Sequence, residues 1–293
     1  MTKIDSFTVY SLPFISLIIV IVMGVVAVLS FYSYPILEKE GLRFITSIEW
    51  NTKDESYGIL PALAGTFYTS FLAVIFSIIL SLGVVVFVYE YAPRSFRGGI
   101  QSSLYYAAAI PTVVYGIWGL DYVVPLVRNV SNLLSLKSSP TGQSILAAAI
   151  VLVFMNTPYL SLIISEAYRS IPFSYEEALY SIGALGFERF KVKYGLVKGA
   201  VVSATLLALG RCVGETTAVS MLIGNSYNVA FSPLEPGVTV SSIIVNFITE
   251  ASLYRYMTSA LYGAALIMLL FSVSFTALGV WIARKLMRGV WND

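Results

Sequence analysis

The chain has 293 residues, of which 57% are apolar and 12% are charged, and its mean hydropathy is +0.81. Soluble domains carry about 25% charged residues, so this composition excludes a water-soluble globule and predicts a membrane protein. A formal charge of +2 without a basic block argues against nucleic-acid binding. The chain has no histidine and one cysteine, Cys212, which removes zinc-thiolate sites and histidine-based triads. We therefore expect no metal and no cofactor.

Six windows are long and apolar enough to cross a bilayer core, which needs about 20 helical residues. They predict an all-α polytopic membrane protein, folded as a single transmembrane domain over residues 1–293. The first window exceeds a signal-peptide core and lacks an Ala-x-Ala site, which favours a retained anchor. The expected spans are residues 12–32, 63–89, 98–120, 144–166, 199–223 and 256–284.

Lysine and arginine are distributed unequally over the segments between these spans. With both termini in the cytoplasm, the inner segments hold eleven of these residues and the outer segments hold six. Because cytoplasmic loops are enriched in lysine and arginine, we expect this orientation in the cell membrane, in contact with lipid.

The fifth span alone carries charges, Arg211 and Glu215. In a continuous helix their spacing places both on one face. Two interpretations remain: a structural ion pair that makes the span insertable, or a fork of donors on Arg211 for a passing oxyanion, with Glu215 holding it in place.

Helix-breaking residues interrupt the third and fourth spans. Pro111 and Pro158 free backbone groups, which a membrane tolerates where protein or a water-lined cavity satisfies them. Thr112, Tyr115 and Asn156 follow or precede these prolines. They either line a path or belong to simple kinked packing.

Two connections are longer than turns. The outer segment 33–62 has an amphipathic pattern that suits either an interfacial helix or a solvated loop with apolar anchors. In the inner segment 169–198, Ser174 and Glu177 have the spacing of a capping box, which predicts a short helix that ends near Gly183.

Missing motifs narrow the function further. The chain has no Walker loop, so ATP energy would have to come from another subunit. It has no Gly-x-Ser-x-Gly elbow, which leaves an enzyme with little support.

Glu177-Ala178-Leu179 followed by Gly183 resembles the EAA loop of ABC-importer permeases, the element that docks a coupling helix into a cytoplasmic ATPase. Leu179 replaces the second alanine of that motif, and Gly195-Leu196 stands where the family has Leu-Pro. From about Gly58 onward the chain is similar to one branch, the phosphate permeases of the PstC type in the binding-protein-dependent transport family. The similar motifs are Gly65-Thr66, Glu90-Tyr91-Ala92-Pro93, Pro111 to Gly116, Gly210 to Thr216, Ile223-Gly224-Asn225 and Pro236 to Thr239.

This resemblance implies a type I importer permease, itself without catalytic residues, that encloses the path with a homologous PstA-like permease. Two copies of a PstB-like ATPase and an extracytoplasmic, PstS-like phosphate-binding protein would complete the assembly. Arg211, Glu215 and Thr216 would meet phosphate, and Glu177, Ala178 and Gly183 would couple to the ATPase. The alternatives are a permease for molybdate, tungstate or sulfate, and a proton-coupled secondary transporter that uses Glu215 as its proton carrier.

Overall fold

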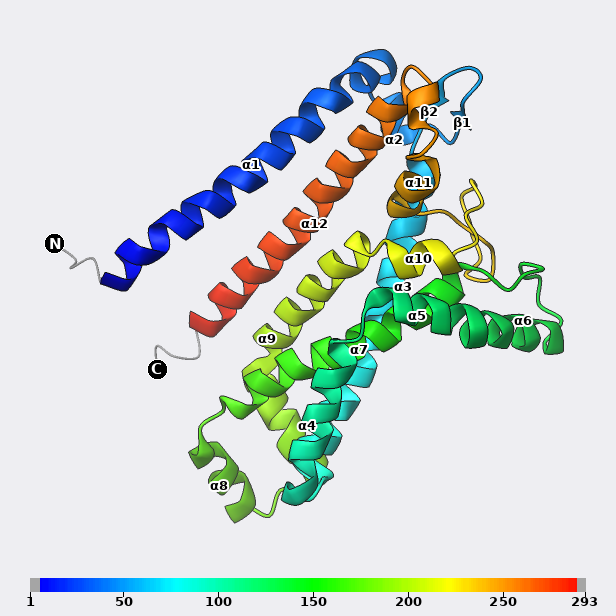
Figure 1. The fold of residues 1–293 in the computed structure, drawn as a ribbon. Helices are drawn as coiled ribbons and strands as arrows, with labels where there is room; N and C mark the ends of the chain where they lie inside the picture. The colour runs from blue at the N-terminus through cyan, green and yellow to red at the C-terminus, as the bar shows by residue number, and fades with distance from the viewer. Residues whose placement is uncertain (1–5, 289–293) are drawn as a thin grey trace. The chain divides into compact units, whose positions relative to one another are not determined.

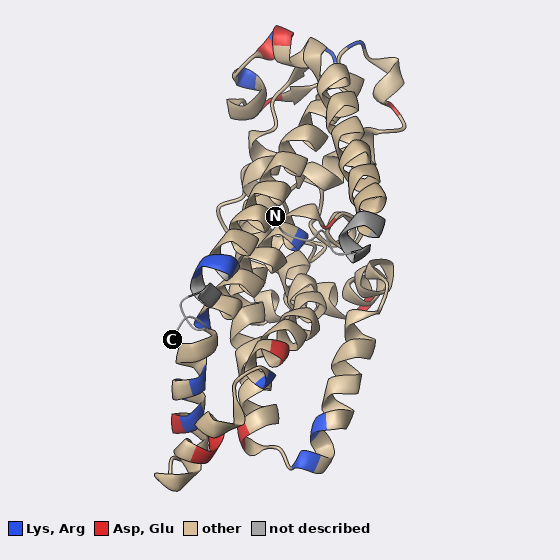
Figure 2. Ribbon diagram, turned by 90° about the vertical axis from the view of Figure 1, so that its left-hand side faces the viewer, with Lys and Arg blue, Asp and Glu red and all other residues tan. Residues whose placement is uncertain are grey.

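The computed structural model describes residues 6–288, which are mainly helical (Figure 1). Within this part of the chain, five helices are long and apolar enough to cross a membrane, and a bent helix pair makes a sixth if it is counted as one span. The five are Ser11–Glu40, Leu60–Tyr91, Ile145–Arg169, Gly186–Gly214 and Met257–Ile282. Figure 2 shows long stretches of these helices without a charged residue.

The chain divides into two compact units, which we describe separately. The first comprises Met1–Leu60 and Asn246–Ile267, and the second comprises Pro61–Val245 and Met268–Asp293. Helix α12 (Met257–Arg288) contributes to both units.

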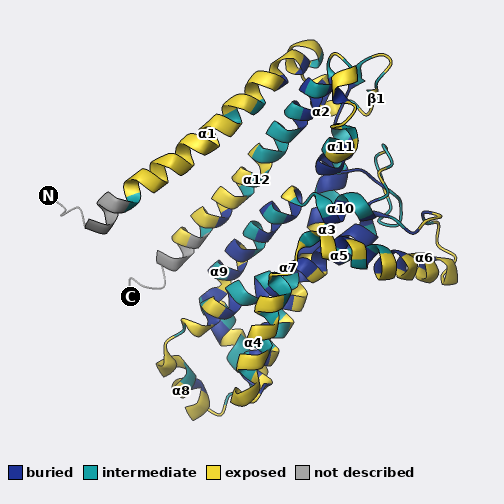
Figure 3. Cartoon of the chain, viewed as in Figure 1, coloured by how far each residue is buried: buried dark blue, intermediate teal, exposed yellow. Residues whose placement is uncertain are grey.

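Helix α1 (Ser6–Glu40) opens the first unit and is longer than the span expected over residues 12–32. It continues past Gly24 and Pro35 and ends before Gly41, which has a φ of +56°. Its apolar side chains are exposed along most of its length (Figure 3). Near its end, the backbone N–H of Ile36 donates to Ser259 Oγ of α12 at 2.9 Å.

The outer segment 33–62 is folded rather than a solvated loop. Tyr57 pairs with Trp50 across a two-stranded sheet, and burial, with a smaller effect of Glu55, raises the pKa of Tyr57 to about 12. Phe44 is fully buried against Gly263. Phe44 and Tyr57 therefore pack within the unit, whereas Leu42 and Ile48 of the same segment are exposed. The short elements of the first unit are α2 (Arg43–Thr46), β1 (Trp50–Asn51), β2 (Ser56–Tyr57) and the 3-10 helix η3 (Ala251–Leu253).

Helix α7 (Ile145–Arg169) forms the centre of the second unit. It packs against α4 (Arg94–Ala108) on one side and α9 (Gly186–Gly214) on the other (Figure 1). Most of its residues are buried, and many of these are alanine and serine, which allow helices to approach closely. Helix α3 (Leu60–Val86) ends in a π-helical turn, η1 (Phe87–Tyr91).

The expected single helix over residues 98–120 is wrong. The chain bends by 89° between α4 and the helix that begins at Thr112. Pro111 causes this break because it has no N–H to donate and disfavours helical backbone at the residue before it. The second arm consists of α5 (Thr112–Trp118), the π-helix η2 (Gly119–Val123) and α6 (Val124–Leu133).

The expected continuous helix over residues 199–223 is also interrupted. Helix α9 ends at Gly214, and Glu215 has extended backbone with φ −70° and ψ 126°. A separate helix, α10 (Thr217–Leu222), follows. The remaining helix of the region is α11 (Val240–Phe247).

The inner connection is shorter than the expected segment 169–198 because its basic stretch belongs to α9, which begins at Gly186. The predicted short helix exists as α8 (Phe173–Ser181). The expected capping box is absent: Pro172, not Ser174, is the N-cap, and its side chain has no polar group to cap the helix. Proline suits this position because the first helical N–H groups have no partner within the helix.

Two motifs that are far apart in the sequence meet beside α3. Thr66 Oγ1 donates to Ala62 O at 2.7 Å and accepts from the N–H of Val240 at 3.0 Å. A Cβ atom on Gly65 would overlap the carbonyl oxygen of Val238. Only glycine at position 65 therefore allows the loop before α11 to lie against α3.

Gly65→Ala is expected to destabilise the protein, because overpacking against backbone costs about 1–3 kcal/mol. Thermal unfolding of the detergent-solubilised chain should show a lower Tm. Gly83→Ala is the matched control: Gly83 lies in the same helix with nothing within 4 Å of an added Cβ. Its helix propensity rises, so its Tm should be unchanged or higher. Equal Tm values for the two variants would contradict the close approach.

Candidate functional site

Arg211 lies in the last turn of α9, where unpaired helix carbonyls favour a cation. Its guanidinium lies over the ring of Tyr159 in α7, 5.0 Å from the ring centroid. Among residues 6–288, no carboxylate oxygen lies within 4.0 Å of it. The ion pair with Glu215 that a continuous helix predicts is therefore not formed, because the helix ends between the two residues.

Glu215 and Thr216 occupy the break between α9 and α10. Glu215 Oε1 accepts from the N–H of Ala218 at 3.3 Å, so the carboxylate caps the start of α10. The Thr216 hydroxyl donates to the carbonyl of Gly214 at 3.2 Å. The three predicted path residues thus lie at one interruption of the membrane helices, with their backbone held by local hydrogen bonds.

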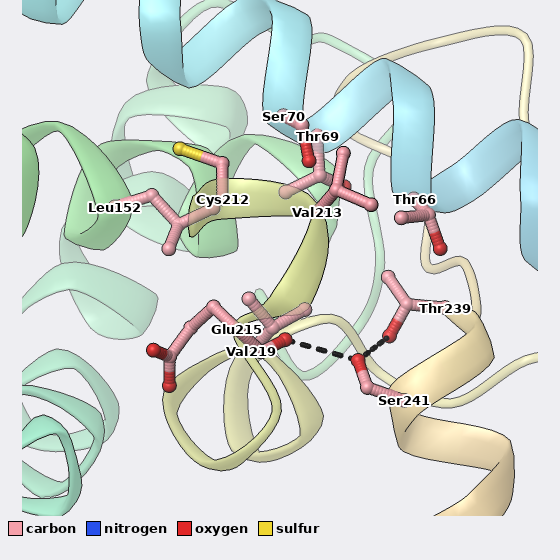
Figure 4. Close-up of a pocket in the computed structure, with 10 residues that line it drawn as sticks. All are labelled: Thr66, Thr69, Ser70, Leu152, Cys212, Val213, Glu215, Val219, Thr239 and Ser241. Carbon is pink, nitrogen blue, oxygen red and sulfur yellow. Dashed lines mark hydrogen bonds between the residues drawn. The ribbon is translucent and has the colours of Figure 1, made fainter. Parts of the chain in front are cut away.

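A narrow pocket begins beside this break (Figure 4). The Ser241 hydroxyl donates to the backbone oxygen of Glu215 at 2.9 Å and lies 3.2 Å from Thr239 Oγ1. Thr69 Oγ1 is buried without a hydrogen-bond partner among the described residues. The space is too narrow for a water molecule. It is lined by Thr66, Thr69, Ser70, Leu152, Cys212, Val213, Glu215, Val219, Thr239 and Ser241.

The three further candidates from the broken spans have different surroundings. Tyr115 donates to the carbonyl of Ala107 at 2.9 Å, across the bend. Asn156 is buried and donates to Cys212 Sγ at 2.9 Å, which joins α7 to α9. Thr112 is half-buried at the first position of α5. Of the three, Asn156 thus donates a hydrogen bond to a residue that lines the pocket.

The residues predicted to couple to an ATPase lie on and after α8. Glu177 and Ala178 are exposed, and the carbonyl of Ala178 accepts from the Ser181 hydroxyl at 2.8 Å. Gly183 has φ +72° and ends the helical segment with nothing within 4 Å of an added Cβ. The exposed face of α8 is thus available to another chain.

Sequence reasoning missed a buried ion cluster that centres on Glu90. Arg189 Nε lies 2.8 Å from Glu90 Oε2, Lys193 Nζ lies 3.0 Å from Oε1, and the Tyr168 hydroxyl donates to Oε1. The sequence places Arg189 and Lys193 in the connection 169–198, after the short helix, with no partner predicted for either. The signal that was available is Glu90 itself, a single acidic residue at the end of a long apolar window.

Arg211 supplies a guanidinium at this break, and Thr216 and Ser241 supply hydroxyl groups beside it. Within the described part of the chain, no three histidine, cysteine, aspartate or glutamate side chains are grouped as metal ligands. A planar guanidinium and several hydroxyl donors are the groups that recognise a tetrahedral oxyanion.

Comparison with known proteins identifies the class. Residues 87–288 match the family described as binding-protein-dependent transport system inner membrane component. The chain belongs to this family. It is a multi-pass membrane protein and a permease component of an ABC importer. In such importers ATP is hydrolysed on a separate chain, and the permease works with a substrate-binding protein.

Similar proteins indicate which branch of this family the chain resembles. The chain is 35% identical, over 97% of its length and 94% of the relative's, to the "Probable phosphate transport system permease protein PstC" of Methanocaldococcus jannaschii. It is 32% identical to the "Phosphate transport system permease protein PstC" of Xylella fastidiosa, over 86% of this chain and 80% of the relative. These findings confirm the resemblance to PstC-type permeases and the all-α permease fold.

Other matches agree with this. The chain is 31% identical to the "Probable ABC transporter permease protein YqgH" of Bacillus subtilis, over 81% of this chain and 76% of the relative. A solved structure of the MetNI methionine ABC transporter in inward-facing conformations aligns with a TM-score of 0.58 and 16% identity, covering 76% of this chain and 93% of that chain. At this identity the structural match supports the fold alone.

The narrow pocket predicts slow chemical modification of Cys212, the one cysteine of the chain. In the assembled transporter without ATP, a maleimide should label Cys212 far more slowly than an exposed engineered thiol, Lys53→Cys in a Cys212→Ser background. Labelling of Cys212 should accelerate during ATP turnover if the helices that line the pocket separate. Rapid labelling at rest would contradict the closed pocket.

Proposed function

We propose that this chain is the membrane-spanning permease subunit of an ATP-driven phosphate importer, and that Arg211 binds phosphate as it passes. The observation that carries this proposal is the position of Arg211 at a break in the membrane helices, without a carboxylate partner among the described residues. Intramembrane charges face a partner or a water-filled path, so an unpaired guanidinium favours an anionic substrate. The relatives named as phosphate permeases supply the identity of that anion.

Transport requires weak binding at this site, because an ion that binds too tightly is not released. Arg211 offers a bidentate fork, while the hydroxyls of Thr216, Thr239 and Ser241 offer neutral donors. Affinity and selectivity then reside mainly in an external phosphate-binding protein. ATP-driven closure of two ATPase subunits pushes on α8 and moves the spans between inward-open and outward-open states.

The proposed assembly has four kinds of subunit. A homologous PstA-like permease completes the path, two PstB-like ATPases bind on the cytoplasmic side, one of them at the exposed face of α8 through Glu177, Ala178 and the turn at Gly183, and a PstS-like protein delivers phosphate. Both termini lie in the cytoplasm, which the eleven-to-six distribution of basic residues supports.

The first test concerns Arg211. Arg211→Gln should abolish uptake of radiolabelled phosphate while the complex still assembles, because no buried carboxylate loses its partner. Arg211→Lys should restore little phosphate uptake, since the point charge of lysine replaces the planar, bidentate guanidinium. Uptake is normalised to assembled complex, and excess sulfate or molybdate is added to distinguish a permease for another oxyanion.

Glu215→Gln is the companion variant, because the amide oxygen still accepts from the N–H of Ala218. Phosphate uptake should persist and should not follow a pH gradient. Loss of uptake in this variant together with pH-driven uptake in the parent would favour a proton-coupled transporter. Full uptake by Arg211→Gln would defeat the phosphate role of Arg211.

The orientation is tested at two lysines. In a Cys212→Ser background, an impermeant maleimide applied to intact cells should label Lys53→Cys, in the outer segment, and not Lys191→Cys, in the basic part of α9. Permeabilised cells provide the control, in which both positions should react. Labelling of position 191 but not 53 in intact cells would reverse the topology.

A further inference from the structure

Helix α8 is attached to the second unit by few apolar contacts. Leu179 is its one buried residue. One side of the helix borders a polar cavity of about 340 Å³ rather than a hydrophobic core. Glu176 contributes to this cavity from α8, and the facing side chains include Arg97 and Gln101 of α4 and Arg169 of α7. Apolar packing therefore cannot carry a displacement of α8 to the spans.

Two cations of α9 make the polar contacts with α8. Lys193 Nζ lies 3.9 Å from Glu176 Oε1. The guanidinium of Arg189 lies over the Tyr180 ring, 4.6 Å from its centroid, and Nη1 donates to the carbonyl of Ala184 at 3.2 Å in the turn that follows α8. Residues of α9 therefore contact α8 near its start and near its end.

The same two cations converge on Glu90, at the end of α3. The side chain of Glu90 is 1% exposed, and those of Lys193 and Arg189 are 5% and 13% exposed. Tyr168 of α7 donates to the same carboxylate, and Arg189 Nη2 donates to the carbonyl of Glu90 at 3.3 Å. One carboxylate therefore joins α3, α7 and α9 with the two residues that hold α8.

The connection extends to α4. Glu90 lies in the π-helical turn η1, whose carbonyls are not all satisfied within the helix. Arg97 Nη2 donates to Tyr89 O at 2.9 Å, and its Nε donates to Ala92 O at 3.3 Å. Since removing one partner from a buried charge cluster leaves uncompensated charges, this arrangement resists separation of its members.

We infer that Glu90 is a positioning residue for transport: it makes α8 and the adjoining ends of α3, α7 and α9 move as one body. This inference rests on the proposed function, in which an ATPase moves α8. Glu90 touches neither substrate nor ATPase in this scheme. Its role is to pass the displacement of α8 to the helix that carries Arg211.

The test compares Glu90→Gln with a matched control, Glu166→Gln. Glu166 pairs with Arg169 at 3.7 Å at the end of α7, but its side chain is 76% exposed, so the pair contributes little. In the assembled transporter in proteoliposomes, phosphate uptake per ATP hydrolysed should fall at least about fivefold in Glu90→Gln, within the range of measured coupling between sites. The control should match the parent.

A second variant removes the contacts with α8 while the buried cluster stays intact, in case Glu90→Gln does not assemble. Glu176 and Tyr180 are partly exposed, so Glu176→Gln with Tyr180→Leu should fold and should also lower uptake per ATP. In both variants, amide hydrogen exchange over residues 173–181 should accelerate, and in Glu166→Gln it should not.

A merely structural role would lower uptake and ATP hydrolysis together, in proportion to assembled complex, and that result would overturn the inference. An unchanged ratio in the variants that assemble would overturn it as well. A parent complex without phosphate uptake would contradict the proposed function alone. Accelerated exchange in α8 would then still support the positioning role, and unchanged exchange would refute it.

Discussion

Backbone N–H and C=O groups within a bilayer must find partners in the protein, and each interruption of the membrane helices here depends on how that requirement is met. At the bend before α5, the Tyr115 hydroxyl reaches back to the carbonyl of Ala107. At the break after α9, Ser241 donates to the carbonyl of Glu215, and the carboxylate of Glu215 accepts from Ala218. Polar side chains therefore lie at these helix ends, where they satisfy the backbone. In the proposed function, the same polar groups allow an ion to pass.

The charges at Glu90 and at Arg211 differ in how completely they are paired. Glu90 is surrounded by Arg189, Lys193 and Tyr168, so its charge is compensated within the fold. Arg211 has an aromatic ring beside it and no carboxylate within 4.0 Å among the described residues. A compensated cluster favours one fixed arrangement, whereas an uncompensated guanidinium attracts a mobile anion. This difference supports the proposed mechanical role of Glu90 and the proposed substrate role of Arg211.

Apolar windows predicted the spans at 63–89 and 144–166 well, because the length of an apolar run depends on composition alone. They did not predict which of the two prolines breaks its helix. Pro111 bends the chain by 89°, yet Pro158 lies inside the continuous helix α7. The difference comes from tertiary packing: Gly116 allows the arm after Pro111 to lie against α10, where a Cβ would meet Met221 Sδ at 2.7 Å.

The candidate site was predicted in its residue types but not in its geometry. Arg211 and Glu215 stand out as the two charges in an apolar window, and the resemblance assigned them a role. Their separation depends on where α9 stops, and Gly214 is the one local sign of that end. The partnership of Glu90 with Arg189 links positions 99 residues apart. A single sequence carries no signal for such a contact.

Helix α1 leaves most of its surface unpacked by the rest of the chain. On such a surface the side chains need only be apolar, because few neighbouring atoms of the chain pack against them. One apolar residue exchanges there for another at little cost to the fold of the chain, whereas the small residues of α7 are fixed by close packing. In α1 the apolar composition therefore matters more than the order of the residues.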